Sequence, residues 1–435
     1  MGAPFSAAEL STKVAADGVA ILPVHRASRH VAYQVGTIIT AGFAATYAGS
    51  LLGPLQETMR AAAALSDNQI ALLQGPTLYF PAIAAAIPLG LLIDRFSRSR
   101  LLAIFVALQV IGTVLTAWAP TFAVLMMARA VVGLMICATA MDASALLGCI
   151  VPAHRRGRAF MTLGIAQIAG ISAAFGLGGK LITYFGPASD GWRWAMLWLS
   201  APLLLVFALT ATLSEPQRTE RDEFRVPLRA AVEELWRLRG MALTLSVGPV
   251  VVAMSYMAAL VWAAPIITRK FALPPDRVGA IIGSVVLVSG LVGSLLGGVL
   301  ADLSQRSGGP RRTIWLMAGL ALLQIPAGFF GVVKDLAALV ALLALLSTLS
   351  NMKGIICATV STVAIPNHLR GLCFGLQNAV ASVFVSLSPV LVSLISAKAG
   401  GSGQIGAALA VVSLATSVLG IVTFILGRNY FPDKT

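Results

Sequence analysis

Twelve apolar stretches, each close to the length needed to cross a membrane, constrain the fold of this chain more than any other feature. An α-helix that rises about 1.5 Å per residue needs about 20 residues to cross a bilayer core of about 30 Å. The stretches, six in each half of the chain, run over residues 31–52, 70–92, 101–118, 122–150, 160–185, 192–213, 241–267, 278–300, 314–333, 336–365, 372–395 and 405–426. Only helices satisfy all their backbone groups within such a segment, so the pattern predicts an all-α membrane protein with twelve transmembrane helices.

The composition agrees with a membrane protein and argues against a soluble one. Hydrophobic residues make up 58% of the chain and charged residues only 11%, against about 25% in ordinary globular domains. The net charge of +14 would suggest a nucleic-acid partner in a soluble protein, but basic residues in a membrane protein collect on cytoplasmic loops and face the lipid bilayer. We therefore expect no nucleic-acid partner. The four cysteines show no C-x-x-C spacing, so we expect no metal, no cofactor and no disulfide framework.

A charged turn occurs once in each half of the chain. It reads GLLIDRFSRSR from Gly90 to Arg100 and GVLADLSQRSGGPRR from Gly298 to Arg312. Two copies of such a turn between apolar stretches indicate a duplicated bundle of two pseudo-symmetric six-helix halves. The expected organisation is an N-terminal segment (1–30), a first bundle (31–213), a linker (214–240), a second bundle (241–427) and a tail (428–435).

Arginine and lysine indicate the orientation of the chain in the membrane. With the N-terminus in the cytoplasm, the even-numbered loops carry most of the arginines, including six between Arg218 and Arg239 in the linker. This bias places both termini and the linker in the cytoplasm. Within the linker, Pro227 precedes a run in which Val232, Leu235 and Trp236 share one face among charged residues, which predicts a short interfacial helix.

The charged turns resemble the signature of a known family. In the first turn, the residues that match the G-x-L-x-D-R-x-x-R motif between helices two and three of the major facilitator superfamily are Gly90, Asp94, Arg95, Arg98 and Arg100. In the second copy they are Gly298, Asp302 and Arg306, and Arg129 to Gly133 is similar to the helix-four motif of that superfamily. The resemblance covers about residues 31–426 and implies two six-helix halves, a small-molecule substrate, transport by alternating access and no enzymatic activity.

Finer features resemble the bacterial spinster-like branch of that superfamily. They are LSDNQIALLQG from Leu65 to Gly75, HRRGRA from His154 to Ala159, and GWRW from Gly191 to Trp194. This branch implies a monomeric, multi-pass protein of the bacterial inner membrane and a lipid-like substrate. In the resembling superfamily, helices one, four, seven and ten line the central cavity.

The chain also departs from its relatives. Spinster-like proteins carry an Asp-Arg pair in helix one, where this chain has Ala48-Gly49 or their neighbours, and a Gly-x-Gly-Glu-Ala element in helix four, where it reads Gly133 to Cys137. In helix five, Ala174-Phe175 stands where drug antiporters have Gly-Pro. The ionisable site usual in the branch is therefore missing, and the multidrug interpretation is weakened.

Charged residues deep in the apolar stretches are the best pointers to a functional site, because a charge at mid-bilayer costs about 2.5 to 3.5 kcal/mol on the mildest scale. Arg129 and Asp142 share helix four, but the helical geometry places them on different sides of it. By the resemblance, Asp142 pairs with Arg98 as a conformational latch; a proton site and cavity lining are the alternatives. Arg129 contacts either substrate or the backbone carbonyls of a neighbouring helix.

Lys353 is the most informative of these residues, because it lies too deep in helix ten for its amine to reach water easily. We weigh three roles for it: a ligand of an anionic substrate, a partner in a polar lock between helices, and a side chain extended to the cytoplasm. Ser350 lies on the face of Lys353, whereas Asn351 lies on a second polar stripe, and only one of these faces can meet the cavity.

Three further polar residues complete the predicted substrate site. Thr40 and Tyr47 are seven positions apart and share a face of helix one, and Tyr256 lies in helix seven. Residues of these types at helical spacing are more often packing residues than ligands, so each is a weaker candidate than Lys353.

The embedded charges also bear on substrate and coupling. Two embedded cations, with Asp142 expected to be latched, favour an anionic or zwitterionic substrate. Coupling to a counter-anion, facilitated movement, and a proton carried by Lys353 remain open, with Glu57 as a fallback proton site. The alternatives to a transporter of small organic or lipid-like anions are a multidrug/H⁺ antiporter and a sensor that binds its ligand without moving it. A membrane enzyme is disfavoured, since the sequence shows no constellation of nucleophile and base.

Overall fold

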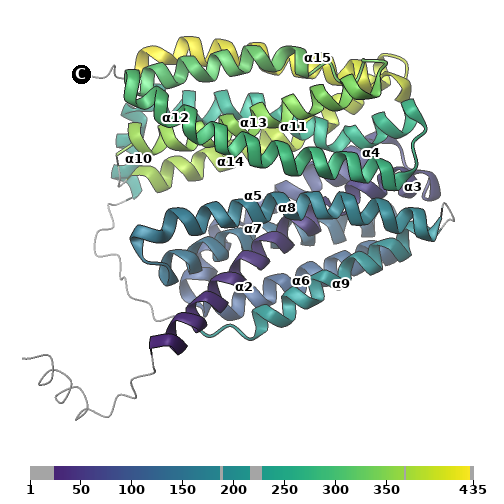
Figure 1. Ribbon diagram of the computed structural model, residues 1–435, viewed down its shortest axis with the longest axis horizontal. Coiled ribbons are helices and arrows are strands. Elements are labelled where there is room, and N and C mark those ends of the chain that lie inside the picture. The colour runs from purple at the N-terminus through teal and green to yellow at the C-terminus, as the bar shows by residue number, and fades with distance from the viewer. Residues whose placement is uncertain (1–23, 187–189, 216–227, 367–368, 432–435) are drawn as a thin grey trace, which may run out of the picture.

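The protein is a two-layered bundle of helices. The computed structural model describes residues 24–186, 190–215, 228–366 and 369–431, and this part of the chain contains α- and 3₁₀-helices and no strand. Figure 1 shows helices α2 to α9 as one layer and helices α11 to α15 as the other, with α10 at one edge between them. This is the predicted arrangement of two halves.

The first half contains six spans, two of which are broken. Its helices are α2 (Val24–Ser50), α3 (Leu52–Ala62), α4 (Asp67–Gln74), α5 (Pro76–Arg95), α6 (Arg98–Trp118), α7 (Phe122–Ile150), α8 (Ala153–Phe185) and α9 (Gly191–Ala211). The first span is α2 followed by α3, and so extends ten residues beyond the predicted end at Leu52. The second predicted span divides at Gly75, and Pro76 occupies the first turn of α5, where the missing N–H of proline costs no helical hydrogen bond.

The second half follows the amphipathic helix α10 (Leu228–Arg237), in which Leu235 is buried and Trp236 is exposed; an interfacial position for this helix stays a prediction. Its spans are α11 (Arg239–Phe271), α12 (Pro275–Ala327), α13 (Leu336–Ala364), α14 (Arg370–Lys398) and α15 (Ile405–Gly427), with short 3₁₀-helices η3 (Ser402–Gln404) and η4 (Arg428–Tyr430). Helix α12 contains both the eighth and the ninth predicted spans. Its chain turns at Gly309, where φ of 67° favours glycine.

The number of spans agrees with the prediction. Ten helices of the described part of the chain are long and apolar enough to cross a membrane. Counting α12 twice, for its two spans, and adding the proline-containing α5 gives twelve. Helix α7 has the bounds predicted for the fourth span, whereas residues 1–23 and part of the linker (216–227) lie outside the described residues.

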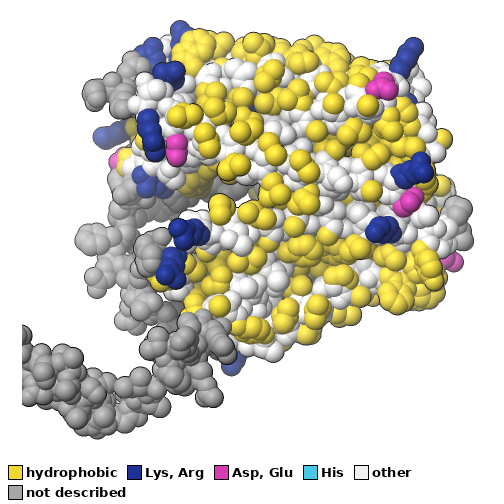
Figure 2. Space-filling model, viewed as in Figure 1, with side chains coloured by type: hydrophobic (Ala, Val, Ile, Leu, Met, Phe, Trp, Pro, Cys, Tyr) yellow, Lys and Arg dark blue, Asp and Glu magenta, His cyan; other side chains and the backbone are white. Residues whose placement is uncertain are grey.

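The two ends of the bundle differ in charge. One end, which we call the arginine-rich face, carries a group of Lys and Arg side chains (Figure 2) and includes the charged turns with the exposed Arg95 and Arg306. The other end, which we call the opposite face, carries Glu57, Asp67 and Arg269.

Helices α8 and α12 form the main seam between the halves. Gly279 lies so close to the backbone of α8 that an added Cβ would stand 2.3 Å from the carbonyl oxygen of Phe175. The Ser172 hydroxyl donates to the carbonyl oxygen of Gly283 at 2.7 Å, and an added Cβ at Gly290 would meet Ile168. The contacts of Gly279 and Gly283 lie in the half of the seam nearer the opposite face, and that of Gly290 lies near its middle. At the arginine-rich end, Figure 2 shows a hollow between the two layers.

Candidate functional site

The buried cation of the first half, Arg129, is held by backbone carbonyl groups. It is 1% exposed, and its guanidinium donates to the carbonyl oxygens of Ala48 at 3.4 Å and Gly49 at 2.9 Å. These atoms belong to α2, so Arg129 braces α7 against the first span. Of the two roles considered for Arg129, the geometry shows the contact between helices.

Neither predicted ligand of helix one lines the cavities described below. The Tyr47 hydroxyl donates to the carbonyl oxygen of Leu199 at 3.1 Å, and its ring stacks on Phe43 within the core of the first half. The Thr40 hydroxyl donates to the carbonyl oxygen of Thr37 at 2.8 Å, one turn earlier in its own helix. Each hydroxyl is already bonded to backbone in this conformation, and a role for these two side chains in a substrate site stays a prediction.

The buried cation of the second half, Lys353, is held by a single neutral side chain. It is 3% exposed, and its amine donates to the side-chain oxygen of Gln324. The Gln324 side-chain nitrogen in turn donates to the carbonyl oxygen of Val252 at 3.2 Å. Among the described residues, no carboxylate lies within ion-pair distance of Lys353. Gln324 was not identified from the sequence, since an amide in the ninth apolar stretch carries no pattern of its own.

Lys353 and Ser350 line a cavity of about 230 Å³ between α11, α13 and α14. Gln377 and Asn378 of α14 supply further polar groups to its walls. The Ser350 hydroxyl is buried and has no hydrogen-bond partner among the described residues. A lysine and an unbonded hydroxyl on one wall of a cavity are groups that can bind an anionic ligand. We call this the lysine cavity.

Asn351 lies on the other polar stripe of α13, beside Tyr256 of α11. The two side chains are joined by a hydrogen bond, and Asn351 also donates to the carbonyl oxygen of Ser347 at 2.8 Å. Tyr79 of α5 lies within electrostatic range of both Tyr256 and Arg129. The two predicted ligands are thus packed together, next to a tyrosine that the sequence did not single out.

A second cavity, of about 280 Å³, lies between the two halves. We call it the central cavity. Its polar lining consists of Thr46, Ser50, Gln74, Tyr79, Cys137 and Ser382. Most of the other lining residues are small or apolar residues of α2, α5, α7, α8 and α11. The central cavity can therefore hold a small, largely apolar group.

One face of α11 connects these cavities. Pro249 and Ala253 line the lysine cavity, and Met257 and Leu260 line the central cavity. The spacing of three and four residues places all of them on a single stripe of the helix. Residues 381 and 382 of α14 also belong one to each cavity. The lysine cavity and the central cavity are therefore neighbours along one path through the protein.

The first charged turn is joined to the end of α9 by Glu215. The Glu215 carboxylate accepts from the Ser97 hydroxyl at 2.6 Å, from the Arg98 backbone N–H at 3.1 Å and from the Ser99 backbone N–H at 3.0 Å. A carboxylate at the N-terminus of α6 satisfies N–H groups that lack partners in the helix. Partial burial acts to raise the pKa of Glu215, but these hydrogen bonds outweigh it and hold the pKa below its usual value.

The predicted latch between Arg98 and Asp142 is not closed. Asp142 is fully buried, and neither of its oxygens has a hydrogen-bond partner among the described residues, although Arg98 is within electrostatic range. The Arg98 guanidinium donates instead to the Cys149 sulfur at 3.0 Å. No hydrogen bond between Arg98 and Asp142 is formed in this conformation, in which Glu215 anchors the first charged turn, so the latch stays a prediction.

The remaining residues of the predicted switch lie at the arginine-rich face. Arg95, Asp302 and Arg306 are exposed, and the side chain of Asp94 lies outside the described residues. An added Cβ would find open space at Gly298 and an ordinary contact, 3.8 Å from Met141, at Gly90. Neither glycine is therefore required by close packing in this conformation. The role of these residues as a switch stays a prediction.

The opposite face carries an ion-pair cluster that joins the halves. Arg269 of α11 contacts Glu57 of α3 at 2.7 Å and Asp67 of α4 at 2.7 Å, with further hydrogen bonds to the second oxygen of each carboxylate. Gln56 also donates across the halves, to the carbonyl oxygen of Val261 at 2.8 Å. Glu57, the fallback proton site, is therefore engaged in holding the opposite face closed.

Comparisons with known proteins agree with this architecture. The chain resembles a solved bacterial homologue of the human lysosomal transporter Spinster, in an inward-facing and unoccupied conformation, with 19% identity and a TM-score of 0.75 over 92% of this chain and 96% of that one. It is also similar to a D-xylose–proton symporter, with 18% identity and a TM-score of 0.66 over 90% of this chain and 97% of that one. It is similar as well to the nucleoside transporter NupG, with 12% identity and a TM-score of 0.71 over 91% of this chain and 99% of that one.

The same comparisons delimit what is shown. At these identities the likeness shows the fold, and the Spinster homologue supports the predicted spinster-like resemblance at that level. No curated protein matches the chain. The family profile of the Major Facilitator Superfamily, whose members carry small molecules across membranes, matches residues 38–389. This chain is therefore a multi-pass membrane protein that belongs to the Major Facilitator Superfamily.

Proposed function

We propose that the protein is a secondary transporter that moves an anionic or zwitterionic small organic or lipid-like molecule across the bacterial inner membrane by alternating access. The arginine-rich face, with both termini, lies in the cytoplasm. The observation that carries the proposal is Lys353, a buried cation on the wall of a cavity, held by one neutral amide.

The argument from Lys353 is energetic. A buried ammonium group without a counter-charge is costly, and one hydrogen bond to Gln324 compensates only part of that cost. An anion in the lysine cavity would supply the missing charge, and Ser350 and Asn378 would supply further hydrogen bonds. Binding of an anionic group would therefore remove the free-energy cost of the unpaired Lys353 charge in the ligand-free protein, and this gain would contribute to affinity.

Alternating access is supported by the difference between the two faces. Arg269, Glu57 and Asp67 join the halves at the opposite face, and the α8–α12 seam is tightest in the same half of the molecule. The hollow lies at the arginine-rich end (Figure 2). The structure is therefore interpreted as the state open to the cytoplasm, and the outward-open state requires the Arg269 cluster to break.

Asp142 favours a second candidate, transport coupled to protons. It is a fully buried carboxyl group with neither oxygen hydrogen-bonded among the described residues. A carboxyl group in this position avoids an unpaired charge by carrying a proton. The approach of the positively charged Arg98 side chain would favour the ionised carboxylate and so release the proton. A multidrug/H⁺ antiporter would use such a site, and so would a proton-coupled anion transporter.

A ligand screen on purified protein tests the proposed substrate class. Thermal unfolding is measured with organic acids, phosphorylated metabolites, lysolipids and lipophilic cations, because a ligand that binds the folded state raises its melting temperature. We expect stabilisation by an anionic or zwitterionic class, and no stabilisation of Lys353→Gln by the same ligand. Stabilisation by lipophilic cations alone would contradict the proposal and favour the drug antiporter.

Transport and coupling are then measured in proteoliposomes with the ligand that binds. Uptake that responds to an imposed pH gradient in the wild type and no longer responds in Asp142→Asn would assign the coupling proton to Asp142. Uptake with the same pH response in both proteins would remove Asp142 from coupling. Tight binding without any uptake would identify a sensor.

A further inference from the structure

Phe175 is the one departure in helix five that the proposed function does not explain. It stands with Ala174 where drug antiporters have Gly-Pro, and it is 2% exposed. Its backbone belongs to the α8–α12 seam, since its carbonyl oxygen faces Gly279. Its ring, in contrast, lies against the first span.

The ring of Phe175 rests directly on the backbone of Gly53. An ideal Cβ added at Gly53 would stand 2.6 Å from one ring carbon, 3.0 Å from a second and 3.3 Å from a third. Only glycine leaves room for an aromatic ring at this place. Gly53 lies at the start of α3, just beyond the break at Leu51, so the contact depends on the relative position of α3 and α8.

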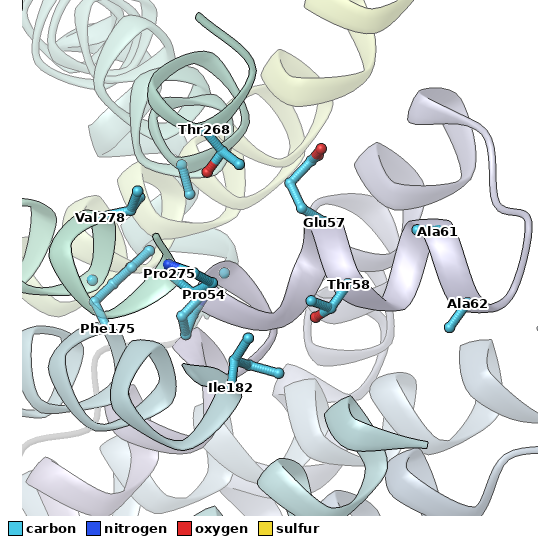
Figure 3. Close-up of a pocket in the computed structure, with 13 residues that line it drawn as sticks. Pro54, Glu57, Thr58, Ala61, Ala62, Phe175, Ile182, Thr268, Pro275 and Val278 are labelled. Atoms are coloured by element: carbon cyan, nitrogen blue, oxygen red, sulfur yellow. The ribbon is translucent and has the colours of Figure 1, made fainter. Parts of the chain in front are cut away.

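The same two residues line two different cavities. Gly53 and Phe175 belong to the wall of the central cavity and also to the wall of a cavity of about 550 Å³ nearer the opposite face (Figure 3). We call the latter the outer cavity. The Phe175 ring and Gly53 therefore form a partition between the two spaces.

The outer cavity lies between the halves and has mostly apolar walls. In Figure 3, Pro54 and Thr58 of α3, Ile182 of α8, Thr268 of α11 and Val278 of α12 surround it. Glu57 stands at its edge, where Arg269 already neutralises the carboxylate. The cavity therefore offers apolar surface and hydroxyl groups, without a net charge to attract a small ion.

The outer cavity continues the stripe of α11 that lines the other two. Residues 249 and 253 face the lysine cavity, 257 and 260 the central cavity, and 264 and 268 the outer cavity. The steps of three and four residues keep all six on one side of the helix. The three cavities are thus arranged in series from the arginine-rich face to the opposite face, with Phe175 between the last two.

We infer that the outer cavity is a second substrate site, which takes the apolar part of an amphipathic substrate, and that the Phe175 ring on Gly53 is the valve between it and the central cavity. The inference rests on the proposed function and adds to it the amphipathic nature of the substrate. When α3 and α8 separate in the outward-open state, the ring leaves Gly53 and the two cavities join.

Cys137 provides a native reporter for the valve, because it lines the central cavity. In a background with Cys149, Cys357 and Cys373 replaced by serine, a membrane-impermeant methanethiosulfonate reagent is added to the outside of sealed right-side-out vesicles. A cysteine at the exposed Asp190, in a cysteine-free background, verifies that the opposite face is outward. The rate at which Cys137 is modified measures how often the route past Phe175 is open.

Removal of the ring is expected to open this route. Phe175→Ala should raise the modification rate at least about tenfold, and Gly53→Ala should raise it too, because its methyl group displaces the ring. Phe43→Ala, which removes a ring of the same size from the core of the first half, should leave the rate unchanged. Wild-type rates in Phe175→Ala and Gly53→Ala, or an equal rise in Phe43→Ala, would overturn the valve.

Occupancy of the outer cavity is tested with Thr268→Cys in a cysteine-free background. Lysophosphatidylglycerol, used below its micellar concentration, should slow the modification of this cysteine at least about threefold, whereas inorganic phosphate should not. No protection would overturn the second site. The labelling of Cys137 needs no substrate, so failure of the anionic substrate class would leave the valve result intact, and the two failures can be told apart.

Discussion

Arg129 and Lys353 are both buried cations in the middle of a membrane bundle, one in each half, but they are held in different ways. Arg129 donates to two backbone carbonyl groups of the neighbouring span, at Ala48 and Gly49. Among the described residues Lys353 has one hydrogen-bond partner, the neutral side chain of Gln324, and it lies on the wall of a cavity. A guanidinium that braces two helices is a structural element, whereas an ammonium group with one neutral partner beside open space is available to a ligand.

The comparison teaches that burial alone does not identify a substrate residue. Both side chains are almost completely inaccessible, at 1% and 3% exposure. The difference lies in the groups that accept hydrogen bonds from each charge: two backbone carbonyl oxygens for Arg129 and one side-chain amide oxygen for Lys353. It follows that the same substitution should have opposite effects on stability at the two positions, and this is the basis of the first two predictions.

The largest expected effect is at Lys353. Lys353→Met removes a poorly compensated buried charge, so the melting temperature of the ligand-free protein should rise while affinity for the anionic ligand falls on the order of 100-fold. Thermal unfolding with and without the ligand identified in the screen measures both quantities. If the Lys353→Met variant is less stable without ligand and still binds with wild-type affinity, Lys353 is a structural cation like Arg129.

Arg129→Met should have the reverse effect. It removes the two hydrogen bonds to α2 and the brace between the spans, so we expect a loss of about 2 kcal/mol of stability and little change in ligand affinity for the protein that folds. Arg129→Lys is the matched control, because one amine cannot reproduce the geometry of the guanidinium. Unchanged stability in both variants, with lost binding, would mean that Arg129 also contacts the substrate.

A third cation, Arg269, differs from both because it forms ion pairs with two carboxylates, those of Glu57 and Asp67. Arg269→Gln should release the opposite face and shift the population toward the outward-open state by about tenfold, which corresponds to roughly 1.4 kcal/mol. Distances between spin labels on α3 and α11 measure the shift, and the double variant with Glu57→Gln should show non-additivity. Strictly additive effects would show that the pair does not control the gate.

The smallest expected effect is at Glu215, the acid that anchors the first charged turn. Its pKa is lowered in the folded protein, so its contribution to stability is complete above its ordinary pKa and is lost as the pH falls through the lowered value. Glu215→Gln should therefore reduce the melting temperature slightly at pH 7 and flatten the decline of stability in acid. Identical pH profiles for the two proteins would exclude this role.

The fold could be predicted largely from the sequence, because a membrane imposes one length on every span. The run from Phe122 to Ile150 coincides with α7, whereas the breaks at Leu51 and Gly75 lie inside apolar runs that continue past them. Hydropathy does not register a break that costs a helix only one or two hydrogen bonds. At the second break, Gly75 packs so closely against the carbonyl oxygen of Ser386 that an added Cβ would stand 2.2 Å from it, and this contact lies far away in the sequence.

The candidate site could be predicted only in part. A charge in an apolar stretch stands out, so Arg129, Asp142 and Lys353 were visible. Their partners were not, because Gln324 is a neutral residue 29 positions away and the partners of Arg129 are backbone atoms. The partner of Tyr47 was hidden for the same reason, since its hydroxyl is bonded to a carbonyl group of α9 that no residue type reveals.

Uptake by proteoliposomes tests the central claim, that Lys353 binds an anionic or zwitterionic substrate during transport, most directly. Wild-type protein, Lys353→Ala and Lys353→Arg are reconstituted in equal amounts after each is shown to be folded and monodisperse, and uptake of the ligand from the screen is measured over time. The account predicts uptake by the wild type, partial uptake by Lys353→Arg and none by Lys353→Ala. Unchanged uptake kinetics in Lys353→Ala would contradict it.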